Sequence, residues 1–328
     1  MSKLTIVMYH YVRDLKHSRY PEIKGLDIAL FKEQLVYIKK HYNVISAYDL
    51  MDAIKSNSTS DLPPQSLLLT FDDGYIDHFT DVFPVLDREK LSGCFFPPAK
   101  CILESQVLDV NKIHFILACV PDKSVLVNYI YQSLDENRSL YHLESSEFYW
   151  QKCGVPSRYD TAEVMFVKYM LQRELLEKLR YVITNELFKK FVSNDEKAFS
   201  KELYSSIDQI SCLQRNGMYI GSHGFDHYWL NSISEDDQRK EIDLSLEFLK
   251  KIGSDPFRWI MCYPYGEYNE SLLTILKERN CSVGLTTKVG VADLNSDNPL
   301  TLPRLDTNDL PKDSKLEPNE WTIKVKSG

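Results

Sequence analysis

The chain has 328 residues, of which 43% are hydrophobic and 26% are charged, and its formal net charge is −8. This length suits one large domain with an insertion, or two domains, and the acidic balance argues against nucleic-acid binding. The chain starts without a long apolar segment or a small-residue cleavage site, so we expect no signal peptide, no membrane span and a cytoplasmic location. Seven cysteines without paired metal spacing are typical of small buried residues in a reducing compartment.

The first hundred residues alternate between strand and helix patterns. Short apolar runs bounded by turn residues predict strands, and apolar residues that recur every three or four positions predict helices. In chain order we expect strand 4–9, helix 31–42, strand 44–46, helix 48–54, strand 66–71, helix 75–89 with a kink or break at Pro84, and strand 93–96.

Residues 99–206 have a different pattern. Gly154 is the only glycine between Gly93 and Gly217, and tracts such as Met165–Phe191 carry apolar residues at helical spacing among many lysines and glutamates. We therefore expect a mostly helical insertion or cap over 99–206. Because it follows the end of a strand, where α/β folds place their active sites, two roles are open. It is a lid that shapes the substrate pocket, or a packing or oligomerisation element.

The alternation of strands and helices resumes near Ile207. We expect there a helix, strand 218–221, helix 234–252 with a capping-box start at Ser234 and Asp237, strand 259–262, helix 271–279, and strands 282–286 and 299–302. Repeated β-α units predict a parallel sheet or a barrel, and periodicity alone does not choose between them. This α/β domain would comprise residues 1–98 and 207–328.

Two adjacent carboxylates end the strand at 66–71. The sequence Thr70-Phe71-Asp72-Asp73-Gly74 places them where open α/β sheets and barrels carry their chemistry. Neighbouring side chains on an extended backbone point in different directions, so one aspartate can bind a metal while the other acts as a base. The same residues are also good turn formers, and the motif alone leaves a plain turn equally open.

Two histidines follow the strand at 218–221. In Gly221-Ser222-His223-Gly224-Phe225-Asp226-His227, imidazoles four residues apart can face one point in a helical turn or a tight loop. An aspartate with two histidines leaves coordination positions open for water, which is typical of a catalytic and not of a structural metal site.

Three blocks in this order resemble the polysaccharide deacetylases of the NodB-homology type. They are Thr70–Gly74, His223–His227 and the shorter, less specific Tyr263-Pro264-Tyr265-Gly266. The resemblance covers roughly residues 1–100 and 207–310, and it implies a distorted (β/α)7 barrel, an α/β fold. It also implies one divalent metal, zinc or else iron, nickel or cobalt, held by Asp73, His223 and His227.

The resemblance also assigns roles to other residues. Asp72 matches the general base, and Tyr265 matches the position whose backbone N–H donates to the oxyanion. Many members use a histidine near the C-terminus as the acid, but this chain has none after His227. The early histidine after the first strand, His10, is similar to that of a subgroup acting on β-linked N-acetylglucosamine polymers, so His10 is the acid candidate, with a structural histidine as the other interpretation.

The arginine that usually precedes the third motif is absent, because position 263 is tyrosine. Arg304 could orient Asp72 by a charge-assisted hydrogen bond instead, and Arg258 is the alternative.

The implied function is hydrolysis of an N-acetyl group on an amino sugar or saccharide, in bacterial surface glycan biosynthesis inside the cell. Nucleotide-linked or lipid-linked sugars are the expected substrates, and no nucleic-acid partner is expected. The alternatives are hydrolysis of a non-sugar linear or cyclic amide on the same barrel, and a non-catalytic carbohydrate-binding relative. The sequence does not indicate an oligomeric state.

Overall fold

The computed structural model describes residues 3–56 and 58–326. The chain forms two compact units. The first consists of residues 1–14, 25–106 and 201–328, and the second of residues 15–24 and 107–200.

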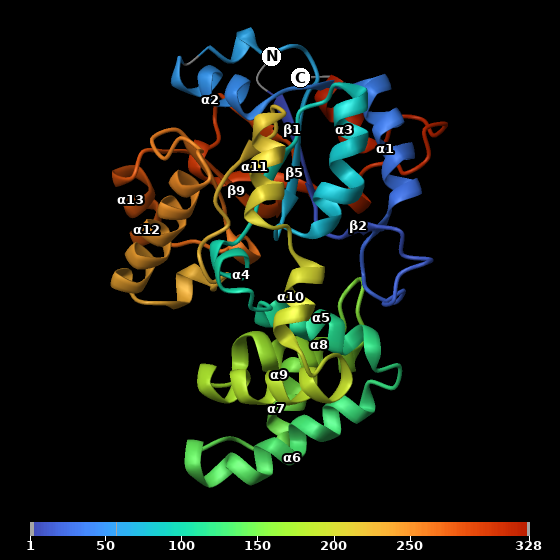
Figure 1. Cartoon of the computed structure of the whole chain (residues 1–328), viewed down its shortest axis with the longest axis vertical. Helices are drawn as coiled ribbons and strands as arrows, with labels where there is room; N and C mark the ends of the chain where they lie inside the picture. The colour runs from blue at the N-terminus through green and yellow to red at the C-terminus, as the bar shows by residue number, and fades with distance from the viewer. Residues whose placement is uncertain (1–2, 57, 327–328) are drawn as a thin grey trace. The chain divides into compact units, whose positions relative to one another are not determined.

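The first unit is built on a curled parallel sheet (Figure 1). Within the described residues, seven strands follow one another in the order β7 (Tyr219–Ile220), β6 (Cys94–Phe96), β5 (Ser66–Asp72), β1 (Lys3–Tyr9), β11 (Leu302–Asp306), β9 (Cys281–Val289) and β8 (Trp259–Cys262). Each neighbouring pair is parallel. A parallel bridge between Ser222 and Met261 then joins the two edges of the sheet. The expected distorted (β/α)7 barrel is therefore confirmed.

Helices surround this barrel. They are α1 (Ile28–His41), α2 (Ala47–Lys55), α3 (Phe83–Glu89), α4 (Ala99–Glu104), α11 (Ile207–Arg215), α12 (Glu235–Lys251), α13 (Glu270–Glu278) and α14 (Glu320–Lys326). Four short strands complete the unit: β2 (Val12–Arg13), β3 (Leu26–Asp27), β4 (Asn43–Val44) and β10 (Ala292–Asp293). No helix of the described residues is long and apolar enough to cross a membrane.

Strand alternation decides which side chains enter the barrel. In β5, Leu68 belongs to the interior apolar cluster, whereas Leu67 and Leu69 belong to the cluster beneath the surrounding helices. Since successive strand residues face opposite sides, Asp72 shares the interior side with Leu68. By the same argument Arg304 lies on the inner side of β11, whose Leu302 is also interior. The carboxyl end of the barrel thus carries polar groups above an apolar interior.

The second unit is helical. Its helices are α5 (Asp109–Cys119), α6 (Ser124–Tyr141), α7 (Ser146–Cys153), α8 (Ala162–Tyr169) and α9 (Glu177–Phe191), while α10 (Glu196–Leu203) crosses the division between the units. The rings of Phe115, Phe188 and Phe199 pack edge to face in its core. The ring of Tyr20 also contacts Phe115 and Phe199, at centroid distances of 4.9 and 5.8 Å. This aromatic contact explains why residues 15–24 pack with the helical unit.

One expected helix contains an irregular turn, and one expected strand begins later than predicted. Residues 76–89 are continuously helical, close to the expected range, but His78–Val82 form a π-helical turn that runs into α3, with Pro84 at the start of α3. Proline has no N–H group, so it removes one hydrogen bond from the helix at this irregular point. The last strand begins at Leu302, not at 299, because Pro299–Thr301 form a 3₁₀ turn capped by Asn298. Arg304 therefore lies inside a strand and does not follow one.

Candidate metal and catalytic site

The two aspartates occupy a sharp turn at the end of β5. Asp72 is the last residue of the strand, and Asp73 has a φ of 75° while Gly74 has a φ of 68°. A side chain at position 74 would meet the Cβ atom of Pro97 at 2.7 Å, so the turn needs glycine there. A left-handed backbone costs a non-glycine residue about 1–3 kcal/mol, so the surrounding structure must hold Asp73 in this conformation. The turn separates the directions of the two carboxylates.

The histidine pair lies in a loop and not on a helix. His223 follows β7 closely, Gly224 has a φ of 74° and His227 has a φ of 56°. The Nδ1–H group of His223 donates to the carbonyl of Cys262 at 2.7 Å. This bond fixes the tautomer and leaves the Nε2 lone pair of His223 for a cation.

Asp73, His223 and His227 form a buried group whose donor atoms converge. The Oδ1 atom of Asp73 lies 3.3 Å from Nε2 of His223 and 3.4 Å from Nε2 of His227. Two donors bound tetrahedrally to zinc at 2.0–2.1 Å would be about 3.3–3.4 Å apart. Among the described residues, Asp73 Oδ1 has no hydrogen-bond partner although it is buried. The donor set and the unsatisfied oxygen fit a divalent cation.

The electrostatics of this group also suit a cation. Burial would raise the pKa of Asp73, but the imidazoles of His223 and His227 hold that pKa well below its ordinary value. Burial lowers the pKa of His223, but its contacts with Cys262 and with the two carboxylates outweigh burial and raise that pKa well above its ordinary value. The negative field that favours a proton on His223 favours a metal ion beside it, whereas burial, with the neighbouring imidazoles, lowers the pKa of His227.

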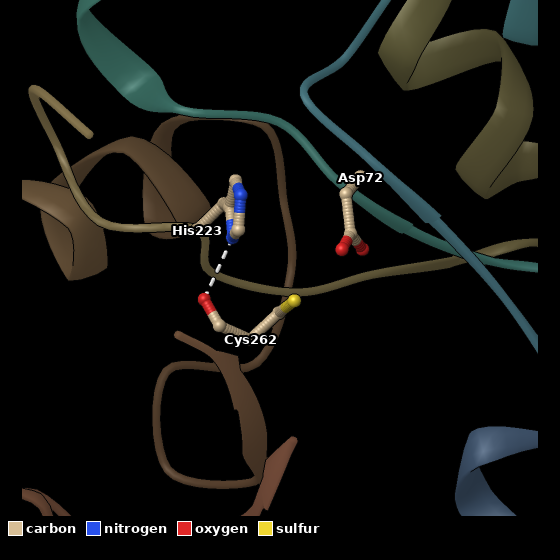
Figure 2. Close-up of side chains that lie close together, drawn as sticks. All are labelled: Asp72, His223 and Cys262. Atoms are coloured by element: carbon tan, nitrogen blue, oxygen red, sulfur yellow. Dashed lines mark hydrogen bonds between the residues drawn. The ribbon is translucent and has the colours of Figure 1, made fainter. Parts of the chain in front are cut away.

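Figure 2 shows a second group of possible ligands, Asp72, His223 and Cys262, drawn from β5, the histidine loop and β8. This group suits a metal less well. Burial raises the pKa of the Cys262 thiol, and only a thiolate is a good metal ligand. Asp72 is also bound to an arginine. Of the two groups, the one that contains Asp73 therefore suits a metal better.

Asp72 is paired with Arg304 inside the barrel. The Nη1 atom of Arg304 lies 3.0 Å from Oδ1 and 2.9 Å from Oδ2 of Asp72, and both side chains are only 1% exposed. The guanidinium also donates to Thr70 and to the carbonyl of Thr286. Burial would raise the pKa of Asp72, but Arg304, followed by the nearby imidazoles, holds it below its ordinary value. Asp72 is thus ionised at neutral pH.

The alternative arginine does not reach Asp72. Arg258 instead pairs with Asp52 at 2.5 Å and donates to the carbonyl of Tyr48. His10, the acid candidate, lies close to Asp72, with 4.0 Å between its Nε2 atom and Oδ2 of Asp72. The imidazole is 40% exposed, and its backbone carbonyl accepts a hydrogen bond from buried His78.

Tyr265 follows β8 in a strained turn, with a φ of 58°. The turn needs glycine at the next position, because a Cβ atom on Gly266 would lie 2.1 Å from Oγ1 of Thr287. The Tyr265 ring meets His227 edge to face at 4.8 Å and stacks on Trp229 at 4.1 Å. Trp229 and Tyr265 therefore form a half-buried aromatic pair beside the histidine loop.

The structure adds Tyr75 to this site. Its hydroxyl donates to Oδ2 of Asp73 at 2.5 Å, which leaves Oδ1 directed at the two imidazoles. The sequence placed Tyr75 directly after the Asp-Asp-Gly motif, but only the fold shows that its ring turns back to the carboxylate. Cys262 also lies at this site, because Met261 in β8 forms a parallel bridge with Ser222, the residue before His223.

The comparisons with known proteins agree with the motifs. A family model described as Polysaccharide deacetylase matches residues 176–284, which include His223, His227 and the block at 263–266. A protein of Bacillus subtilis (strain 168) named as a polysaccharide deacetylase, YxkH, is 29% identical over 99 residues. The aligned segment covers 29% of this chain and about a third (34%) of that relative.

Solved structures share the fold over nearly the whole chain. The Streptococcus pyogenes deacetylase PplD in complex with acetate has a TM-score of 0.56 at 18% identity and covers 99% of this chain and 97% of its own. IcaB from Ammonifex degensii has a TM-score of 0.54 at 17% identity, with the same coverage. A de-N-acetylase from Aggregatibacter actinomycetemcomitans has a TM-score of 0.53 at 15% identity, covering 98% of both chains.

Proposed function

We propose that this chain, whose sequence and fold are similar to those of polysaccharide deacetylases, is a metal-dependent hydrolase that removes N-acetyl groups from an amino sugar within a saccharide. One observation carries the proposal. Two adjacent buried carboxylates have separate partners, since Asp73 faces two imidazoles and Asp72 is held by Arg304. With these separate partners, one carboxylate is suited to bind a metal and the other to transfer a proton.

Asp73, His223 and His227 would hold the metal, which when bound would polarise the amide carbonyl and acidify a water molecule. Asp72 is ionised and takes a proton from the attacking water. The backbone N–H of Tyr265 donates to the oxygen of the former carbonyl as negative charge develops on it. His10 gives a proton to the nitrogen as the C–N bond breaks, so that acetate and a free amine leave. These roles are those that the resemblance implies, and the Arg304–Asp72 pair and the approach of His10 to Asp72 support them.

The aromatic pair supports a sugar over a small aliphatic amide. Trp229 and Tyr265 are half-buried and stack on each other next to His227, and an aromatic ring at such a place suits contact with the apolar face of a pyranose ring. All seven cysteines are free, which suits a reducing compartment. We therefore propose a saccharide made inside the cell, either nucleotide-linked or lipid-linked, in the assembly of a bacterial surface glycan.

The substrate is tested by acetate release from a panel of compounds. We expect release from nucleotide-linked or short lipid-linked N-acetylated amino sugars, and none from linear or cyclic non-sugar amides. Activity on polymeric chitin alone, or detection of the protein outside its native cell, would contradict the proposed substrate and location. Activity on the non-sugar amides alone would favour that alternative, and no activity on any compound would favour a binding protein.

The metal is tested by elemental analysis of purified protein. We expect about one equivalent of a divalent ion in the wild type, and loss of most of it in His223→Ala and His227→Ala, because each variant removes one of three ligands. His41→Ala is a matched control, since His41 lies on α1 and its Nδ1 atom contacts Lys326. Unchanged metal content in both loop variants would refute the ligand assignment.

A further inference from the structure

Helix α12 carries a buried polar stripe. Gln238, Glu241 and Ser245 are 0%, 6% and 2% exposed, respectively. Their spacing of three and four residues places them on one side of the helix. Buried polar side chains require partners. Those of Glu241 and Ser245 lie in the histidine loop, whereas Gln238 bonds to the Leu230 carbonyl and to Asn269.

Glu241 binds the backbone between the two histidines. Its Oε2 atom accepts the N–H of Phe225 at 3.1 Å and the N–H of Asp226 at 2.9 Å. One turn further along α12, the hydroxyl of Ser245 lies 2.5 Å from that of Ser222. The Ser222 hydroxyl in turn accepts the N–H of Gly224 at 3.2 Å.

The opposite edge of the loop is held by the start of α4. The N–H groups of Ala99 and Lys100 donate to the carbonyls of Gly224 and Phe225, at 3.2 and 2.9 Å. The Lys100 ammonium also pairs with the Asp226 carboxylate. These bonds leave Glu241 as the acceptor for two consecutive N–H groups at the centre of the loop.

The loop needs such support because its shape is intrinsically unfavourable. No helix brings the two imidazoles together, and the left-handed backbone of His227 costs about 1–3 kcal/mol, which surrounding contacts must offset. Burial raises the pKa of Glu241 to about 7, which means that this carboxyl group is desolvated where it contacts the loop. Its two backbone hydrogen bonds are the compensation that the structure offers.

We propose that Glu241 is a positioning residue for the metal site, one that fixes the backbone between His223 and His227 so that both Nε2 atoms converge with Asp73. It does not touch the metal or the substrate. The inference rests on the proposed function, since it assumes that these three residues bind a metal. Loss of the acceptor would loosen the ligand geometry and weaken metal affinity, and supporting residues of this kind typically contribute about 10–100-fold in affinity.

Two substitutions of Glu241 distinguish the loss of the hydrogen-bond acceptor from a change in side-chain size. Glu241→Met keeps the approximate length but has no oxygen, and we expect Zn²⁺ and Co²⁺ to bind about 10–100-fold more weakly, as measured by competition with a chromophoric chelator. Glu241→Gln keeps a carbonyl oxygen that can accept both N–H groups, and we expect affinity within a few-fold of wild type. Glu247→Met, on the exposed side of the same helix, controls for the charge and should not change affinity.

The visible spectrum of the Co²⁺-loaded protein reports the ligand geometry. It should change in Glu241→Met and be restored in Glu241→Gln. Wild-type affinity and spectrum in Glu241→Met would overturn the inference. If the wild-type protein bound no metal, the result would contradict the proposed metal-dependent function and not the role of Glu241. The two outcomes are therefore distinguishable.

A wild-type measurement covers the case in which Glu241→Met does not fold. Hydrogen exchange of the metal-free protein should show slow exchange at the amides of Phe225 and Asp226, since both donate to Glu241. Rapid exchange at both amides would overturn the inference without any variant.

Discussion

Asp72→Asn should retain the metal but lose turnover by about 10²–10⁴-fold, the usual contribution of a general base. The amide cannot take a proton from water, whereas Asp73 and both histidines are unchanged. The introduced side chain keeps an oxygen that can accept from Arg304, so we expect the variant to fold, with a lower thermal midpoint because the buried guanidinium loses its counter-charge. The measurements are kcat and KM on the best substrate of the panel, metal content, and a thermal scan.

His10→Gln serves as the comparison for Asp72→Asn. It also lowers turnover, but it alters the alkaline side of the pH–rate profile, where loss of a proton from the acid slows the reaction. Near-normal turnover in Asp72→Asn would place the base elsewhere. A profile for His10→Gln that matches wild type would return His10 to a structural role.

Arg304→Met should destabilise the fold by about 3–5 kcal/mol, because it leaves the buried carboxylate of Asp72 without its counter-charge. Arg304 and Asp72 are each 1% exposed, and their closest contact is 2.9 Å. Denaturant unfolding at fixed pH measures the loss. Arg258→Met is the matched control, because the Arg258–Asp52 pair is 34% and 65% exposed and an exposed pair contributes only about 0–1 kcal/mol.

The pH dependence of Arg304→Met has a definite sign. In wild type the pKa of Asp72 is lowered, so the pair stabilises the fold above the unfolded pKa and this stabilisation is lost as pH falls through the folded pKa. In the variant, burial dominates and raises the pKa of Asp72. The difference in unfolding free energy between wild type and variant should therefore be larger near neutral pH than in mild acid.

The acid side of the pH–rate profile of Arg304→Met should also move to higher pH, because the base stays protonated over a wider range. Equal stability losses in Arg304→Met and Arg258→Met, or an unmoved acid limb, would contradict the role assigned to Arg304.

The sequence by itself determined the elements and the chemistry of the motifs. Period-two and helical patterns located most strands and helices of the barrel, because burial of one face imposes those periods. The residue types at 72, 73, 223 and 227 indicated a catalytic metal site. This was possible because each motif is short and directly follows a strand. The sequence predicts a strand over 299–302, but Pro299 and the capping side chain of Asn298 instead form a 3₁₀ turn before the strand begins at Leu302.

Tertiary structure decided which distant side chains meet. Arg304 and Arg258 were both candidates in the sequence, and only strand alternation in β11 turned Arg304 into the barrel toward Asp72. No sequence motif includes Glu241, yet it is 6% exposed and binds two loop amides. Local periodicity reports whether a residue faces a core. It contains no information on which polar group of a remote segment lies opposite, because that depends on how helices and strands pack after the barrel has formed.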